Sequence, residues 1–246
     1  MVEGGDTVRT ELIQDADGEA FVFGNRWDTV IPLSFTVTEE HGLRMEIFPR
    51  IATIGETFLR RFSSSPCSRT ALSWLSSRLS PEISTWGYKK DAFSPCYGRI
   101  LRLRPIDGIC EKSGNLSPFE IKSGDNFRNR TTYDLDATRE AGCLAYGMEE
   151  NGKIVSVAVT HDAPDSEAKA RPVEVGVETI PRARGKGYAT ACLTALASAL
   201  IREGFTVEYR CRMRNVRSFA VARHVGFREI GRYYYYVGRR VHDHGI

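Results

Sequence analysis

The residues with the clearest chemical potential lie in the segment PRARGKGYAT, residues 181–190, where two glycines alternate with basic side chains. Gly185 and Gly187 carry no Cβ, so backbone N–H groups beside them can point outward together. A helix that begins near Lys186 would add roughly half a positive charge at its N-terminus. The segment therefore has the chemistry of a pyrophosphate-binding loop. A tight turn with solvated basic side chains would have the same composition.

Two common phosphate-binding motifs do not fit this loop. The pattern GxxxxGK[ST] is absent, and Thr190 stands where GxGxxG requires its third glycine. The glycine pair alone thus leaves the ligand open.

The residue pattern around the loop predicts the elements that position it. Residues 173–179, VEVGVET, alternate in the manner of a strand, with the odd-numbered residues on one face and Glu174, Gly176 and Glu178 on the other. Apolar residues after the loop recur at helical spacing up to Gly204, where a helix C-cap is expected. The loop should therefore join a strand to the N-terminus of a helix.

The remaining C-terminal half predicts further strands and one more helix. CLAYGM and KIVSVAVT read as two strands joined at Asn151-Gly152, FTVEYRCRM as another strand, and NVRSFAVARHVGF as a helix. In the last strand, EIGRYYYYVG, we expect the run from Tyr233 to Tyr236 to be an edge strand with packed aromatic side chains. This order predicts an α/β layer with a mixed sheet.

The N-terminal half predicts a second α/β region without a catalytic constellation. EAFVFGNRWDTVIPLSFTV and GLRMEIFPR have strand composition, whereas TIGETFLRRF and RTALSWLSSRL have helical spacing. A segment rich in Gly, Ser and Asn follows, so we place a boundary between residues 1–112, of unknown role and able to shape an acceptor pocket, and residues 113–246.

Two motifs combine in the C-terminal half. R-x-x-G-x-G ends at Gly187, and about 28 residues later N-x-x-S-x-x-x-A-x-x-x-G-F begins at Asn215. Together they resemble the acetyl-coenzyme A signature of the GNAT superfamily of N-acetyltransferases, over about residues 115–246. The zwittermicin-A resistance branch is the most similar. The resemblance implies a GNAT-like α/β fold with a mixed, mostly antiparallel sheet flanked by helices, preceded by an N-terminal α/β extension or small domain.

The resemblance also implies acetyl-CoA as a co-substrate. Val177 and Thr179 would offer backbone groups to the pantetheine arm, and the amide near Val177 would polarise the thioester carbonyl. Asn215 would contact the cofactor arm, although it could equally be an ordinary helix N-cap. The expected cofactor-binding residues are Val177, Thr179, Arg182, Arg184, Gly185, Lys186, Gly187, Tyr188, Ala189 and Asn215.

One position departs from the family pattern. Many members carry a Tyr seven residues after the Asn, as the acid for the departing thiolate, but this chain has Ala222. Either the thiolate leaves unassisted, as a thiol pKa of about 8.5 permits, or another tyrosine, such as Tyr188 or Tyr209, takes its place.

The acceptor amine must also lose a proton. Glu178 and Glu174 lie on the strand beside the expected thioester position, and we expect Glu178 to face the acceptor, with Glu174 as the alternative base. Both could instead face solvent or pair with arginines. His161 and His224 are further candidates.

The expected function is therefore an acetyl-CoA-dependent N-acetyltransferase that acylates a primary amine of a small molecule by direct attack in a ternary complex. A non-catalytic coenzyme A-binding module is the alternative. A third reading, nucleic-acid binding through the basic stripe of YRCRMRNVR, lacks the interleaved aromatic side chains on which bases stack. We expect a monomer or homodimer.

Composition limits the other classes of function. The net charge of +3 is too small to imply a nucleic-acid partner, and no apolar run approaches the roughly 20 residues of a membrane helix. MVEGGDTVRT has no signal-peptide pattern, and the six cysteines form no C-x-x-C, so reduced thiols and a cytoplasmic location are expected. His242, Asp243 and His244 could bind a metal, but we expect a solvated tail and no metal.

Overall fold

The structure is a computed structural model that describes residues 10–14, 29–92, 94–109, 116–122 and 128–241. The chain divides into two compact units: unit 1 is Met1–Arg99 with Gly231–Ile246, and unit 2 is Ile100–Ile230. This division differs from the boundary that we predicted after residue 112, because the last strand pairs with strands of the N-terminal half. Composition along the chain carries no signal for such a long-range pairing.

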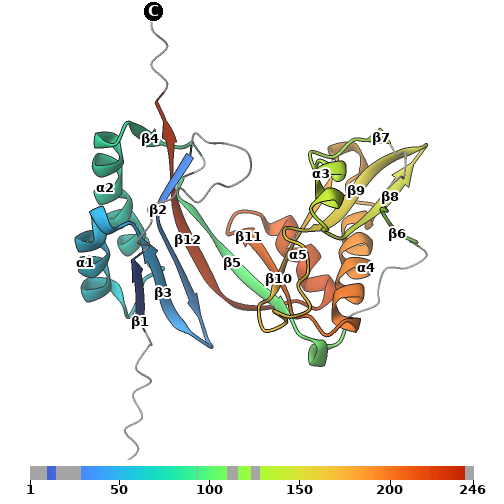
Figure 1. Cartoon of the computed structure of the whole chain (residues 1–246), viewed down its shortest axis with the longest axis horizontal. Helices are drawn as coiled ribbons and strands as arrows, with labels where there is room; N and C mark the ends of the chain where they lie inside the picture. The colour runs from blue at the N-terminus through green and yellow to red at the C-terminus, as the bar shows by residue number, and fades with distance from the viewer. Residues whose placement is uncertain (1–9, 15–28, 93, 110–115, 123–127, 242–246) are drawn as a thin grey trace, which may run out of the picture. The chain divides into compact units, whose positions relative to one another are not determined.

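Unit 1 is a sheet with two helices on one face (Figure 1). Its strands follow the order β1-β3-β2-β12-β5, with β4 also paired to β12. Strand β5 begins in unit 1 and ends in unit 2, whereas β12 begins in unit 2 and ends in unit 1. The elements are β1 (Thr10–Gln14), β2 (Thr29–Thr38), β3 (Gly42–Ile47), the short 3-10 helix η1 (Pro49–Ile51), α1 (Ala52–Phe62), α2 (Arg69–Thr85), β4 (Tyr88–Lys90), β5 (Cys96–Leu103) and β12 (Arg228–Arg240).

Local sequence accounts for the elements of unit 1. Strand β3 alternates between buried and less buried residues, and the buried ones face the helices. Helix α2 begins where the Ser68 hydroxyl accepts a hydrogen bond from the Ala71 amide at 3.2 Å. Its buried residues recur every fourth position from Ala71 to Ile83 and form one stripe against the sheet. The two helices predicted for this half, the strand at GLRMEIFPR and residues 29–37 of the first predicted strand are therefore confirmed, whereas residues 19–28 of that strand lie outside the described residues.

Unit 2 is a mixed sheet with helices on both faces. Its strand order is β5-β11-β10-β9-β8-β6, with β7 paired to β9; the β10–β11 and β7–β9 pairings are parallel, and the β9–β10, β8–β9 and β6–β8 pairings are antiparallel. Its elements are η2 (Pro105–Asp107), β6 (Phe119–Glu120), β7 (Arg128–Asn129), α3 (Leu135–Glu140), β8 (Ala145–Glu150), β9 (Lys153–Thr160), β10 (Val173–Thr179), η3 (Pro181–Ala183), α4 (Tyr188–Arg202), β11 (Val207–Arg212) and α5 (Val216–Val225). The predicted fold class, a mostly antiparallel mixed sheet flanked by helices, is confirmed.

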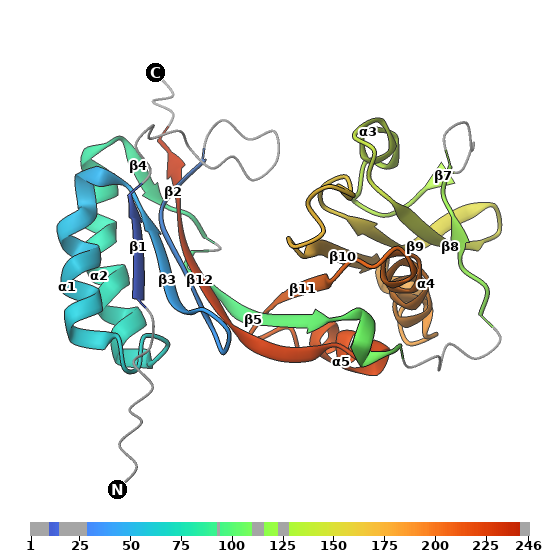
Figure 2. The ribbon, with the colours of Figure 1, turned by 60° about the horizontal axis from the view of Figure 1, so that its bottom comes forward.

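The two faces of this sheet have different cores. Ala158 and Val175 pack with α4 and α5, whereas Val157 and Val159 pack with Leu135 of α3. Figure 2 shows α3 and α4 against opposite sides of β8 and β9. Because neighbouring strands keep paired residues on one face, the odd-numbered residues of β10 face α4 and the even-numbered ones lie on the α3 face.

The tyrosine run of β12 is not at a sheet edge, contrary to our expectation. Strand β12 pairs with β2 on one side and has β4 and β5 as its other neighbours, so it lies inside the sheet. Tyr234 and Tyr236 are fully buried, and the Tyr234 ring stacks on Phe35 with the ring centroids 5.1 Å apart. A Tyr run is compatible with either position, since only the distant partner strands decide between them.

These two buried tyrosines should respond oppositely to loss of the hydroxyl. The Tyr236 hydroxyl lies 2.6 Å from the Ser80 hydroxyl, whereas the Tyr234 hydroxyl has no hydrogen-bond partner among the described residues. Tyr236→Phe should lower the free energy of unfolding by about 1 kcal/mol, and Tyr234→Phe should leave it unchanged or raise it by up to about 1 kcal/mol. Urea denaturation of the two variants measures this difference. Equal losses would mean that the two hydroxyls are equally well bonded.

Candidate functional site

The glycine loop joins β10 to α4 in the predicted manner. Gly185 and Gly187 both have φ of 81°, in the left-handed region that favours glycine. Gly187 is the N-cap of α4, and no side chain caps the helix. The first amides of α4 therefore keep their donor capacity for an anion at the exposed loop.

Two contacts hold the base of this loop against the sheet. The Ile180 amide donates to the Val155 carbonyl at 3.0 Å, and buried Ala183 packs beside both residues. The Arg184 Nε donates to the Thr179 carbonyl oxygen at 3.1 Å. Arg184 thus braces the turn, a role that the sequence did not reveal, while its neighbour Arg182 is exposed.

Glu150, at the end of β8, binds two residues of the loop. Its Oε1 accepts from Lys186 Nζ at 2.6 Å and from the Tyr188 hydroxyl at 2.8 Å. These hydrogen bonds hold the pKa of Glu150 below its ordinary value, and they raise the pKa of Lys186 and of the Tyr188 hydroxyl. Sequence reasoning missed Glu150, because it lies 36 residues before Lys186 and no motif connects them.

Strand β10 loses its partner on one side just before the loop. It pairs with β9 as far as Thr179, but its parallel pairing with β11 ends at the pair Val175–Tyr209. Within the described residues, no strand continues that side of β10. The two strands therefore separate along the last four residues of β10.

The side of β10 on which β11 has ended, here called the open side, carries the backbone groups of Val177 and Thr179. Glu174 accepts at its carbonyl from the His161 amide of the β9 side, whereas the Val173 amide donates to the Thr206 carbonyl on the β11 side. Backbone groups alternate along a strand, so those of Val177 and Thr179 point toward the β11 side, where the pairing has ended. Both residues are thus placed to bond an extended chain that enters between the strands.

Asn215 is the N-cap of α5. Its side-chain oxygen accepts from the Ser218 amide at 3.1 Å. The expected contact with the cofactor arm stays a prediction.

The position of the usual acid, Ala222, is fully buried in the core. Tyr209, one of the alternative acids, is also buried, and its hydroxyl lies 2.8 Å from the Ser218 hydroxyl; burial raises the pKa of Tyr209 to about 12.

The two predicted bases, Glu178 and Glu174, both lie on the α3 face of β10, but in different surroundings. Glu178 Oε2 accepts from the Thr132 amide at 2.9 Å and from the Thr132 hydroxyl at 2.6 Å. Glu174 lies between a histidine and an arginine: its Oε1 is 3.3 Å from His161 Nδ1, and its Oε2 is 3.3 Å from Arg210 Nε. Burial favours a higher pKa for Glu174, but His161 and Arg210 outweigh it and hold the pKa below its ordinary value.

Gly176 lies between these two glutamates, and two side chains converge above it. A Cβ at this position would stand 2.7 Å from His161 Nε2 and closer still to the Tyr133 hydroxyl. Burial raises the pKa of Tyr133, and the charges of Glu178 and Glu174 raise it further. His224, the other histidine candidate, is exposed on α5, where its Nδ1 lies 2.7 Å from the Ala220 carbonyl of the same helix. Only His161 of the two is brought to the predicted site.

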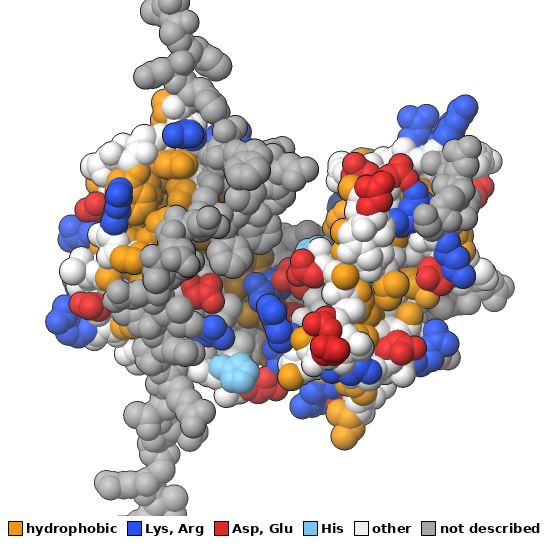
Figure 3. All heavy atoms as spheres, viewed as in Figure 1, with side chains coloured by type: hydrophobic (Ala, Val, Ile, Leu, Met, Phe, Trp, Pro, Cys, Tyr) orange, Lys and Arg blue, Asp and Glu red, His pale blue; other side chains and the backbone are white. Residues whose placement is uncertain are grey.

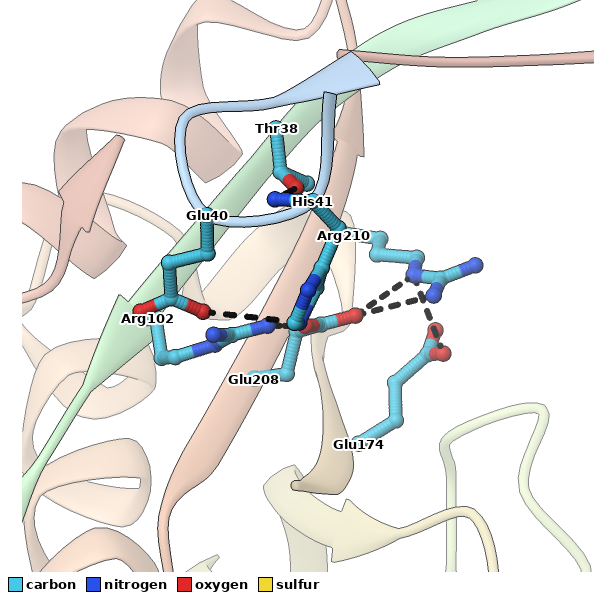
Figure 4. A network of polar contacts seen from close by, with 7 residues as sticks. All are labelled: Thr38, Glu40, His41, Arg102, Glu174, Glu208 and Arg210. Carbon is cyan, nitrogen blue, oxygen red and sulfur yellow. Dashed lines mark hydrogen bonds and ion pairs between the residues drawn. The ribbon is translucent and has the colours of Figure 1, made fainter. Parts of the chain in front are cut away.

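The arginine stripe of β11 is partly neutralised. Figure 4 shows Arg210 between Glu208 and Glu174, with Arg102 on the other side of Glu208. Arg210 Nη2 lies 2.9 Å from Glu208 Oε1, and Arg102 Nη2 lies 3.0 Å from Glu208 Oε2. On the face of unit 2 seen in Figure 3, acidic and basic side chains are interspersed. This arrangement gives the nucleic-acid hypothesis no support.

The described residues carry neither a metal-ligand cluster nor a membrane-spanning helix. No group of three or more His, Cys, Asp or Glu side chains there is placed to hold a metal ion. His242, Asp243 and His244 lie outside the described residues, as does Cys110, and the five described cysteines are free thiols. No described helix combines the length and the hydropathy needed to cross a membrane.

Comparison with known proteins supports one family for the segment that carries this site. A family model described as GNAT acetyltransferase matches residues 134–236, which is less than half of the chain. The matched segment contains β8 to β11, both long helices of unit 2 and the glycine loop. No curated protein sequence matches the chain. The zwittermicin-A resistance branch is not distinguished by this match and stays a prediction.

Solved structures show more distant likenesses. A GCN5-related N-acetyltransferase-like protein from Streptococcus suis is 17% identical, with 66% of this chain and 67% of that chain covered and a TM-score of 0.47. A GNAT-family acetyltransferase from Colwellia psychrerythraea is 13% identical, with 85% and 81% covered and a TM-score of 0.44. A GCN5-related N-acetyltransferase from Kribbella flavida is 14% identical, with 69% of this chain and 74% of that chain covered and a TM-score of 0.40. These likenesses are too distant to carry an argument about function.

The ion pairs of Arg210 make a pH-dependent contribution to stability. Because the pKa of Glu174 is held below its ordinary value of 4.5, this contribution is present above pH 4.5 and is lost as the pH falls through the folded-state pKa. Arg210→Gln should lower the free energy of unfolding at pH 7 by about 1–3 kcal/mol, and the deficit should shrink below pH 4.5. Urea denaturation from pH 3 to pH 7 tests this. Arg217→Gln, which removes the same charge from an exposed position of α5, is the control and should show no such dependence.

Proposed function

We propose that this protein is an acetyl-CoA-dependent N-acetyltransferase that transfers an acetyl group to a primary amine of a small molecule, by direct attack in a ternary complex. The observation that carries the proposal is the separation of β10 from β11, directly followed by a glycine loop at an uncapped helix N-terminus. The GNAT acetyltransferase match spans both features.

The separated strands and the loop suit two successive parts of one ligand. The backbone groups of Val177 and Thr179 would hydrogen-bond the amides of the pantetheine arm, as an added strand does. The amides from Gly185 to Ala189 would hold the pyrophosphate, with further attraction from Arg182, Arg184 and Lys186. An extended amide-containing arm joined to a pyrophosphate is the chemistry of coenzyme A.

The proposed acyl position follows from this placement. With the pantetheine arm beside Val177, the thioester carbonyl would lie at the point where β10 and β11 begin to separate, and the Val177 amide would polarise it. The amine attacks the carbonyl carbon, the N–C bond forms, the C–S bond breaks and the amine loses a proton. Glu178 and Glu174 are the predicted bases, and both lie on the α3 face of β10.

The departing thiolate lacks the usual tyrosine. Ala222 is buried and apolar, and the Tyr209 hydroxyl is bonded to Ser218. Because a thiol has a pKa of about 8.5, the thiolate is a good leaving group near neutral pH, and we propose that it leaves without a dedicated acid. A small-molecule acceptor, a monomeric or homodimeric state, and a cytoplasmic location without nucleic-acid or membrane partners belong to the same proposal.

Transfer and binding need separate assays. Thiol release from acetyl-CoA across a panel of primary amines measures transfer, and titration calorimetry with acetyl-CoA measures binding. Binding together with transfer supports the enzyme. Binding without transfer to any amine would support the non-catalytic coenzyme A-binding module.

Acetyl-CoA should stabilise the folded protein. At about 100 times its dissociation constant it should add about 2.7 kcal/mol, which raises the melting temperature by several degrees. Adenosine, which lacks the pyrophosphate and the pantetheine arm, should do much less. Absence of any shift at millimolar acetyl-CoA would contradict the proposal.

The glycine loop should be required for that shift. Gly185→Asp should abolish it, because the new carboxylate would lie beside the phosphates and repel them. Gly185→Ala is the matched control: its Cβ would meet no atom within 4 Å, and it shares the strain of a positive φ without the charge. Equal loss of binding in both variants would mean that backbone strain at this position, and not charge, determines binding.

Removal of the Glu150 charge should tighten acetyl-CoA binding. Glu150 holds Lys186 and places a negative charge beside the loop, so Glu150→Gln should lower the dissociation constant by about two- to fivefold at low salt. Glu149→Gln is the control, because the Glu149 carboxylate bonds the Gly152 amide of the neighbouring turn. Weaker binding by Glu150→Gln would mean that Glu150 organises the loop for its ligand.

A further inference from the structure

Three polar side chains from different segments meet on the α3 face of β10. His161 directly follows β9, Glu174 lies on β10, and Tyr133 precedes α3. His161 Nδ1 is 3.3 Å from Glu174 Oε1, while His161 Nε2 and the Tyr133 hydroxyl lie above Gly176. The absence of a side chain at Gly176 is what leaves room for both.

This arrangement gives the two nitrogens of His161 different tasks. A carboxylate beside Nδ1 favours the tautomer in which Nδ1 carries the hydrogen, which leaves the lone pair of the neutral ring on Nε2. Nε2 faces the space above Gly176, one residue from Val177. A proton acceptor therefore lies beside the position proposed for the thioester carbonyl.

The two glutamates are less suited to accept the proton directly. Glu174 has one carboxylate oxygen on His161 and the other on Arg210, and these partners stabilise its ionised form, which lowers its basicity. Glu178 has Oε2 occupied by the amide and the hydroxyl of Thr132. Both carboxylates thus have structural partners, whereas among the described residues the partner of His161 is Glu174 at Nδ1, and Nε2 faces the space above Gly176 beside the Tyr133 hydroxyl.

We propose that His161 is the general base that takes the proton of the acceptor amine, and that Glu174 is a positioning residue that orients its ring. This inference rests on the proposed acetyltransferase function. The amine nitrogen forms a bond to the acetyl carbon as the C–S bond breaks, and the amine proton moves to Nε2. The electron pair of the C–S bond leaves with the thiolate of coenzyme A. The imidazolium carries a positive charge that the Glu174 carboxylate stabilises.

Replacement of the imidazole and its chemical rescue test this base. His161→Ala should lower kcat with a proven amine acceptor by roughly 100- to 10,000-fold, with the dissociation constant for acetyl-CoA, measured by calorimetry, nearly unchanged. Added imidazole should raise the rate of the His161→Ala variant by about tenfold or more. Methylimidazoles of different basicity should raise it in the order of their basicity. A structural role for His161 would show no such dependence on the basicity of the added compound.

Two further variants provide a control for His161→Ala and a test of the positioning role of Glu174. His224→Ala removes an imidazole from the exposed face of α5 and should keep the wild-type rate. Glu174→Gln should lower kcat without changing acetyl-CoA affinity, but it should have little further effect in the His161→Ala background, because its contribution passes through the ring. Additive losses from the two substitutions would overturn the positioning role.

The outcomes also separate this inference from the function on which it rests. If the wild-type protein binds acetyl-CoA and acylates no amine, both proposals fail. If the wild-type protein is active and His161→Ala keeps its rate, or if only Glu178→Gln loses it, the acetyltransferase function stands and His161 is not the base.

Discussion

The candidate site depends on the unequal pairing of one strand. β10 is bonded to β9 from Glu174 to its end at Thr179, but its parallel partner β11 accompanies it only as far as Val175. A strand inside a sheet normally has both rows of backbone groups occupied. Here the backbone groups of Val177 and the amide of Thr179 have no strand partner among the described residues, and the ladder with β9 keeps them in place. The Thr179 carbonyl accepts from Arg184 Nε.

The same strand also brings together the two halves of the proposed reaction. Val173, Val175 and Val177 of β10 direct their side chains into the core beneath α4, so only backbone groups of Val177 face the side on which β11 has ended. The even-numbered residues direct theirs to the α3 face, where Glu174 and Glu178 flank Gly176 and the space above Gly176 holds His161 Nε2 and the Tyr133 hydroxyl. A single strand can therefore present the acyl donor and the proton acceptor to one point, because its side chains alternate while its backbone groups keep their direction.

Electrostatics decides which groups on that face are available. Arg210 forms ion pairs with both Glu174 and Glu208, which makes Glu174 part of an ion-pair network and a weaker base. At the glycine loop, Glu150 forms an ion pair with Lys186. In both places the charged residues that the sequence marks as functional have partners in the folded chain. Among the described residues, the backbone amides of the α4 N-terminus have no side-chain cap, and His161 Nε2 faces the space above Gly176.

The sequence by itself determined the local parts of this protein. The alternation of residues 173–179, the glycine pair before a helix of regular apolar spacing, and Asn215 at a helix start all depend on neighbours within a few residues, so their signals are present in the chain. In the N-terminal half, β2, β3, α1 and α2 were predictable for the same reason, whereas β1, β4 and β5 were not predicted. The tertiary structure alone decided the inner position of β12, the point where β11 leaves β10, the bonding of Glu150 to the loop and the convergence of His161 and Tyr133 above Gly176. Each of these is a contact between residues far apart in sequence, and no local pattern encodes which distant side chain will fill a given space.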